Sequence, residues 1–301
     1  MSLRHARAHS ASVSERVHQT VALLRRRGYA VTSAKLAELC LGGPLSDAEL
    51  RWAVAANPDL AITGGLVLSR DAVPDADSIR GRADAHRAES GRYIDLTVQF
   101  VSKLVAVAPF VRSVSIAGSL ASGGFRESDD VDLNLIVDDG YRHVAYVVVN
   151  VLGLVHALGH RAKPVDDLTR RPLAPRLMTA NLILERSQCL PLARQDEDMA
   201  FEFLIAQPVF GIGEIQDVID ANPGLVEHFP QLEDRAAPLA IEAPARRVPS
   251  AVYPRAADGA ARVIGLTAWR YMQWTRRHRP DALARVAYVR ATMRPYTLFD
   301  R

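Results

Sequence analysis

Residues 115–137, with the sequence SIAGSLASGGFRESDDVDLNLIV, decide the fold of this chain. They read as the end of one apolar strand, a Gly-Ser turn, a short helix of small residues and a second apolar strand. Side chains alternate along a strand, so Asp130 and Asp132 are predicted to share one face. Val131 and Leu133 then point to the opposite face, into the core.

Two carboxylates on one face at the edge of a core require a cation. Like charges about 5 Å apart repel by roughly 3 kcal/mol at an effective dielectric constant near 20. Oxygen ligands of this kind suit Mg²⁺ or Mn²⁺, which also accept phosphate oxygens. Main-chain N–H groups after Gly118 and the Ser119 hydroxyl are placed to bind phosphate.

This pattern resembles the nucleotidyltransferase superfamily of the DNA polymerase beta type. The resemblance rests on an apolar strand, Gly-Ser, about ten residues and Asp-apolar-Asp-apolar, and the matching residues are Gly118, Ser119, Ala121, Gly123, Ser128, Asp130, Val131, Asp132 and Leu133. It implies a mixed β-sheet domain that transfers a nucleoside monophosphate from a nucleoside triphosphate to an acceptor, with two metal ions about 3.5 to 4 Å apart. The alternative is a surface turn rich in Gly, Ser and Asp, which leaves Asp132 within an apolar run unexplained.

The resemblance assigns further roles to individual residues. Asp130 and Asp132 would be the metal ligands and catalytic residues, and Gly118, Ser119 and Ser128 would bind the nucleotide. Arg126 is a further candidate for the triphosphate, against the alternative of a solvated loop arginine. Asn181 is a further candidate for nucleotide binding.

A third carboxylate, which in this superfamily comes from a later strand, is not evident. The strand predicted at 176–185 carries Asn181 near its centre and Glu185 at its end. Three alternatives stay open: Glu185, the pair Asp166 and Asp167 in the preceding loop, or no third carboxylate. In the last case a degenerate enzyme that senses nucleotides becomes a serious alternative.

The rest of the chain predicts an α+β protein with a winged helix domain, a mixed-sheet nucleotidyltransferase domain and a C-terminal helical domain. The winged helix is inferred from the order of three helices and a hairpin. The expected boundaries are a disordered start at 1–12, a winged helix-turn-helix at 13–72, a connecting helix at 73–110, the nucleotidyltransferase domain at 111–190 and the helical domain at 191–301, with a Pro/Ala-rich linker around 230–258.

Possible partners follow from charge and aromatic patterns. The net charge of +3 does not favour any particular class of partner. The winged helix could contact nucleic acid, although the predicted third helix carries Arg51 as its sole cation, and packing or partner docking is the alternative. The helix around 260–290 mixes tryptophans with arginines, which suits RNA stacking or an ordinary amphipathic helix. The acceptor is unidentified: a small molecule, a protein, or RNA, including a toxin-like action on tRNA.

Cysteine use and hydropathy favour a cytoplasmic protein with no membrane segment. The two cysteines, Cys40 and Cys189, lie far apart in apolar surroundings, without the spacing of a zinc site or a disulfide framework. The first dozen residues lack the apolar stretch of a signal peptide. The longest apolar run, at 144–158, is shorter than the roughly 20 residues that cross a bilayer, so a buried helix is expected.

Overall fold

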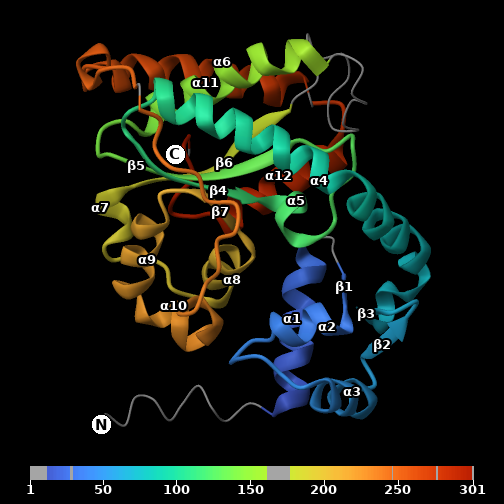
Figure 1. Cartoon of the computed structure of the whole chain (residues 1–301). Coiled ribbons are helices and arrows are strands. Elements are labelled where there is room, and N and C mark those ends of the chain that lie inside the picture. Colours follow the sequence, from blue (N-terminus) through green and yellow to red (C-terminus); the bar gives the residue numbers. More distant parts are fainter. Residues whose placement is uncertain (1–11, 28–29, 161–176, 246, 276, 300–301) are drawn as a thin grey trace.

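The chain is a mixed α+β protein with two small β-sheets (Figure 1), which confirms the predicted α+β class. The computed structural model describes residues 12–27, 30–160, 177–245, 247–275 and 277–299. The expected disordered start falls almost wholly outside these residues. Both cysteines, Cys40 and Cys189, are free and buried.

The N-terminal unit contains the expected three helices and hairpin. Its elements are α1 (Val13–Arg26), β1 (Val31–Thr32), α2 (Ser33–Glu38), α3 (Asp47–Ala56), β2 (Leu60–Thr63) and β3 (Leu66–Ser69). Ser46 and Glu49 form a capping box at the start of α3. The hairpin between β2 and β3 turns at Gly64 and Gly65, whose φ angles of 58° and 81° favour glycine. A short β1 strand completes the sheet in the order β1-β3-β2.

A long helix connects this unit to the second sheet. After the 3₁₀ turn η1 (Arg70–Asp75), α4 (Ala76–Val107) runs for 32 residues. Its second half buries Tyr93, Phe100 and Leu104.

The central sheet has the strand order β6-β5-β4-β7, in which β5 pairs antiparallel with β4 and parallel with β6. Its strands are β4 (Val111–Ala117), β5 (Val131–Val137), β6 (Met178–Glu185) and β7 (Gln207–Phe210). In register, Asp132 lies opposite Ala117 on one side and Thr179 on the other. Val137 lies opposite Glu185 at the far end of the parallel pair.

Helices cover both faces of this sheet (Figure 1). On one face lie α4, α6 (Arg142–Ala157) and α11 (Ala257–Thr275), and their core includes Val114 and Leu133. On the other face lie α8 (Glu197–Ile205), α9 (Ile212–Asp220) and α10 (Pro223–His228). The remaining elements are η2 (Leu158–His160), α7 (Arg186–Cys189), η3 (Pro230–Leu232), η4 (Ser250–Val252) and α12 (Pro280–Thr292).

The second face shares its core with the N-terminal unit. One buried cluster contains Val17 and Leu36 of that unit together with Leu182 of β6 and Phe229 after α10. The Gln231 amide also donates to two main-chain carbonyl oxygens of the N-terminal unit, at 2.9 and 2.8 Å. The N-terminal unit is therefore packed as part of the molecule rather than tethered to it.

The segment 230–258 is largely irregular, as its composition predicted, but it docks on the sheet. Ile241 forms a parallel bridge with Phe210 at the β7 edge, and its N–H donates to the Val209 carbonyl at 2.8 Å. The Val248 N–H reaches the Ala106 carbonyl at the end of α4 at 2.8 Å. The segment therefore ties α10 and η3 to α4.

The apolar run at 144–158 forms α6, which is buried on one side only. Val149 is fully buried, whereas Val151, Leu154 and Val155 are 50 to 60% exposed. Among the described residues, α6 with η2 is the one helix long and apolar enough to cross a membrane by length and composition. Such evidence is weak, because core helices also meet this criterion.

We expect Asn222→Ala to lower the free energy of unfolding by about 3 kcal/mol, because it leaves several buried polar groups unpaired. Asn222 is fully buried and joins three main-chain groups: the Leu192 N–H and the Cys189 and Val218 carbonyls, at 2.6 to 2.7 Å. Urea denaturation measures the loss. Asn57→Ala is the matched control, because its amide accepts one exposed bond at 2.9 Å. Equal losses in the two variants would contradict this interpretation.

Candidate functional site

The turn after β4 lies directly against the carboxylate of Asp132. Gly118 begins α5 (Gly118–Ser122) with a φ angle of 61°, and a Cβ added there would lie 2.2 Å from Asp132 Oδ2. Both the backbone angle and this close approach require glycine. The structure therefore brings Gly118 and Asp132 together, as the sequence predicted, and the next residue, Ser119, is 6% exposed.

The loop before β5 is held by α4. Phe125 is fully buried and its ring centroid lies 4.7 Å from that of Tyr93. Asp129 pairs with Arg82 of α4 at 2.9 Å and also accepts the Arg126 main-chain N–H at 3.1 Å. This anchoring fixes the approach of the chain to Asp130, the residue that immediately precedes β5.

Two other predicted nucleotide-binding residues belong to this loop. The Arg126 guanidinium lies 3.8 Å from an Asp129 oxygen, within ion-pair distance. This contact favours the alternative in which Arg126 organises its own loop. Ser128 lies between Arg126 and Asp130, half-buried.

Two anchoring groups in this region are perturbed by burial. Burial, and secondarily the charge of Glu127, raises the pKa of Tyr93 to about 12, so its hydroxyl stays a donor and reaches Glu127 Oε1 at 3.5 Å. Burial lowers the pKa of His86, whose Nδ1 lies 3.4 Å from the Phe125 N–H. A neutral imidazole with Nδ1 unprotonated accepts this bond, which explains why the uncharged form suits this position.

On the β6 side a hydroxyl stands next to Asp132. Thr179, its register partner, donates from Oγ1 to Asp132 Oδ1 at 3.0 Å. A break in register then follows, so that Asn181 donates to Asn134 Oδ1 at 3.0 Å. Among the described residues of β6, none places a carboxylate beside Asp132.

The candidate role of Glu185 is contradicted by the geometry. Because β5 and β6 run parallel, Glu185 lies opposite Val137, five residues along from Asp132. At about 3.3 Å per residue this is about 17 Å from the aspartates. Its Oε1 instead accepts the Gly140 N–H at 2.8 Å. Asp166 and Asp167 lie outside the described residues.

A glutamate that the sequence analysis missed lies on the same face of the sheet as Asp132. Glu202 of α8 is 5% exposed, and its Oε1 accepts from the side-chain amides of Asn134 and Asn181 at 2.9 and 3.2 Å. Asn134 follows Asp132 by two residues, which is one strand repeat of about 7 Å. The available signal was a single charge inside the apolar helical run AFEFLI at 200–205.

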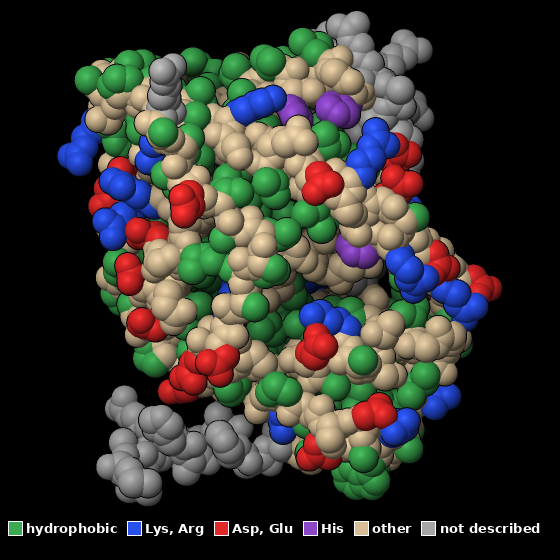
Figure 2. Space-filling model, in the orientation of Figure 1, with side chains coloured by type: hydrophobic (Ala, Val, Ile, Leu, Met, Phe, Trp, Pro, Cys, Tyr) green, Lys and Arg blue, Asp and Glu red, His purple; other side chains and the backbone are tan. Residues whose placement is uncertain are grey.

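The cation of Glu202 comes from the N-terminal unit. Arg27, at the end of α1, lies 4.0 Å from Glu202 Oε2 and 3.3 Å from Asp198 Oδ1. Its guanidinium carbon also lies 5.0 Å from the centre of the Phe201 ring. In the space-filling view the surface is hollowed between the N-terminal unit and the sheet, with charged side chains and a histidine at the rim (Figure 2).

The described residues do not form a complete cage for a divalent cation. Among them, no group of three or more His, Cys, Asp or Glu side chains is arranged to hold a metal ion. Mg²⁺ nevertheless binds through one or two carboxylates when substrate phosphates supply further oxygens. Asp132 lies against the glycine turn and Asp130 two residues before it, so these are the two carboxylates that such a mode of binding would use.

No protein-family model, curated protein or solved structure matches the chain. What supports a function is therefore the motif itself and its geometry: the contact between Gly118 and Asp132, the hydroxyl of Thr179, and Glu202 on the same face.

We expect Gly118→Ala to perturb the carboxylate of Asp132, whereas Gly123→Ala perturbs the backbone alone. Both glycines have positive φ, so each alanine costs about 1 kcal/mol of backbone strain. A Cβ at Gly123 meets no atom within 4 Å, in contrast to Gly118. Urea denaturation and a Mn²⁺ titration followed by electron paramagnetic resonance check the difference. Equal Mn²⁺ affinities in the two variants would argue against the contact as the organiser of the site.

We expect His86 to make the protein less stable as the pH falls. Its pKa is lowered in the folded state, so below about pH 6.5 the unfolded chain binds a proton that the folded chain resists. The free energy of unfolding therefore decreases on going from pH 7 to pH 5. His86→Gln retains an acceptor without titrating and should flatten that part of the profile, measured by urea denaturation at each pH. If His86→Gln leaves this part of the profile unchanged, His86 does not cause the loss of stability at low pH.

Proposed function

We propose that this protein is a magnesium-dependent nucleotidyltransferase, in which the β6-β5-β4-β7 sheet is the catalytic domain and the N-terminal unit is a winged helix-turn-helix. The observation that carries the proposal is the contact of Gly118 with Asp132, which joins the predicted phosphate-binding turn to the predicted metal ligand. A turn built for surface geometry alone has no reason to hold a carboxylate there.

Each residue of the turn and strand then has a role. Asp130 and Asp132 would hold Mg²⁺ or Mn²⁺, and main-chain N–H groups after Gly118, with the Ser119 hydroxyl, would hold the triphosphate. When bound, the cation would neutralise the phosphate oxygens and the leaving pyrophosphate. Thr179 orients Asp132 by its hydrogen bond at 3.0 Å. Catalysis by such a site depends mainly on positioning and charge neutralisation.

Glu202 is the carboxylate best placed to receive the proton of an acceptor hydroxyl. Its partner Asn134 lies one strand repeat from Asp132, and its carboxylate contacts Arg27 and two side-chain amides. Its position does not repeat that of the strand carboxylate expected from the superfamily. A general base of this kind contributes typically 10²- to 10⁴-fold to a rate.

A nucleotide sensor without turnover is the second candidate. Thr179 favours it, because a neutral hydroxyl lies where the superfamily resemblance leads one to expect a third carboxylate. Retention of both aspartates favours the enzyme.

Nucleic acid as partner or acceptor has uneven support. On α3, Arg51 is paired with Asp47, which weakens the case for contact through the winged helix. On α11, Tyr271 and Trp274 are 63 and 56% exposed, and Arg277 stacks on Trp274 at 4.0 Å. That surface suits RNA stacking, but α11 covers the sheet face opposite to Asp132. An RNA docked there would have to reach around the sheet.

We expect Asp132→Asn to reduce nucleotide transfer at least 100-fold, because the strand then offers one anionic ligand instead of two. The assay is Mg²⁺-dependent pyrophosphate release from labelled ATP, GTP, CTP or UTP, with protein, tRNA and small acceptors supplied in turn. Asp138→Asn is the matched control, since Asp138 follows the other end of β5 and pairs with Arg112 at 2.7 Å. Tight binding of a triphosphate without turnover in the native protein would support the sensor. The absence of triphosphate binding would contradict both.

A further inference from the structure

The C-terminal end of the chain concentrates positive charge that the rest of the chain lacks. Residues 259–301 contain nine of the 37 lysines and arginines but two of the 34 aspartates and glutamates, so their net charge is +7. The residues before them carry 28 cations against 32 acids, a net charge of −4. Such an asymmetry within one chain indicates contact with nucleic acid or with an anionic membrane.

The arginines of α11 and of the turn after it are exposed and have no acidic partners. Arg262, Arg270 and Arg277 are exposed, and none of them pairs with a carboxylate in the part of the chain that the structure describes. The single acidic residue of α11, Asp258, accepts hydrogen bonds from the His143 ring and from two main-chain N–H groups of α6. The charge that α11 presents to solvent is therefore positive.

Two aromatic side chains lie beside these arginines. Tyr271 and Trp274 are 63 and 56% exposed, and their ring centroids lie 6.0 Å apart with an interplanar angle of 26°. The guanidinium carbon of Arg277 lies 4.0 Å from the centre of the Trp274 ring. Tyr271, Trp274 and Arg277 thus form one stack, which we call the aromatic column. Aromatic rings and guanidinium planes are the surfaces on which unpaired bases stack.

We propose that α11 and the turn after it bind single-stranded RNA, with bases stacked on the aromatic column and phosphates paired with Arg262 and Arg270. A duplex keeps its base faces within its own stack, whereas RNA loops and ends expose them. Phosphates also supply the negative charge that α11 lacks. A membrane fits less well, because the charged group of Arg277 covers a face of the Trp274 ring that would have to enter the lipid.

This surface is separate from the proposed catalytic site. Ala261 of α11 shares a buried core with Leu133, on the face of the sheet opposite to Asp132 (Figure 1). RNA bound to α11 would therefore be held by the protein without occupying the site of the aspartates. The binding does not rest on the proposed function, and Asp132→Asn should bind RNA as the native protein does.

Fluorescence anisotropy of a short labelled single-stranded RNA, titrated with the full chain, tests the proposal. We expect Trp274→Ala to weaken binding about tenfold, because a base loses its stacking partner, and Trp274→Phe to retain most of the affinity. Trp52→Ala is the matched control, since Trp52 is also 63% exposed but lies on α3 of the N-terminal unit. It should leave the affinity unchanged.

The salt dependence of the affinity tests the phosphate contacts. Arg270→Gln should reduce the slope of log K against log salt concentration by about 0.7, the contribution of one phosphate contact to a single strand. Arg51→Gln is the control, because Arg51 is already paired with Asp47, and it should leave the slope unchanged. Equal slopes in the native protein and in Arg270→Gln would contradict a phosphate contact at Arg270.

The remaining outcomes separate RNA from other partners. Equal affinities for the single strand and for an RNA duplex of the same length would overturn the proposal, as would stronger binding of the corresponding DNA strand. Loss of binding in Trp52→Ala instead of Trp274→Ala would assign the RNA to the N-terminal unit. Binding of phosphatidylglycerol vesicles in preference to RNA would make the surface a membrane contact, and self-association lost in Trp274→Ala would make it an interface between copies. Absence of nucleotide transfer would overturn only the enzyme.

Discussion

The contact between the main chain at Gly118 and the carboxylate of Asp132 is the constraint on which the site depends. It exists because β4 and β5 are antiparallel neighbours, so the end of one meets the beginning of the other. One carboxylate oxygen faces the glycine and the other accepts from Thr179. Asp132 is therefore fixed from both flanking strands, which is the preorganisation that its proposed role as a metal ligand would need.

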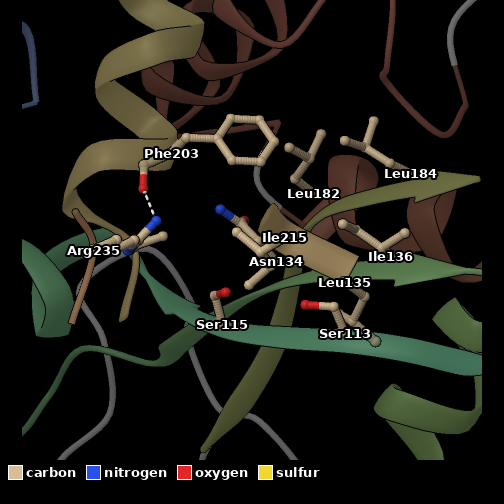
Figure 3. A pocket seen from close by; sticks show the side chains of 11 residues that line it. Ser113, Ser115, Asn134, Leu135, Ile136, Leu182, Leu184, Phe203, Ile215 and Arg235 are labelled. Atoms are coloured by element: carbon tan, nitrogen blue, oxygen red, sulfur yellow. Dashed lines mark hydrogen bonds between the residues drawn. The ribbon is translucent and has the colours of Figure 1, made fainter. Parts of the chain in front are cut away.

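The two faces of the central sheet differ in a way that simple packing does not explain. The face under α4, α6 and α11 carries apolar side chains such as Val114 and Leu133. The opposite face combines polar groups, Ser113, Ser115 and Asn134, with core residues such as Ile136 and Leu182 (Figure 3). Burying polar groups costs free energy unless they are paired. Their placement under helices α8 and α9 is consistent with a face kept polar for binding.

Local structure was predictable from the sequence, whereas partners distant in sequence were not. Helix caps, the hairpin glycines and the alternation of Asp132 with Val131 and Leu133 along β5 depend on neighbouring residues, so the local sequence reveals them. The position of Glu185 depends on the parallel pairing of β6 with β5 and on a break in register, neither of which leaves a local trace. Glu202 reaches the site from a helix 68 residues beyond its partner Asn134.

The charge network around Glu202 couples the N-terminal unit to the site. Two amides from β5 and β6 hold Glu202, but its cation, Arg27, comes from the N-terminal unit, directly after α1. A displacement of α1 would leave a buried carboxylate with hydrogen bonds and no counter-charge, which is unfavourable. Conversely, a positive ion near Asp132 would also be attracted to the Glu202 carboxylate, which Arg27 contacts. The packing of the N-terminal unit and the charge environment of Glu202 therefore depend on each other.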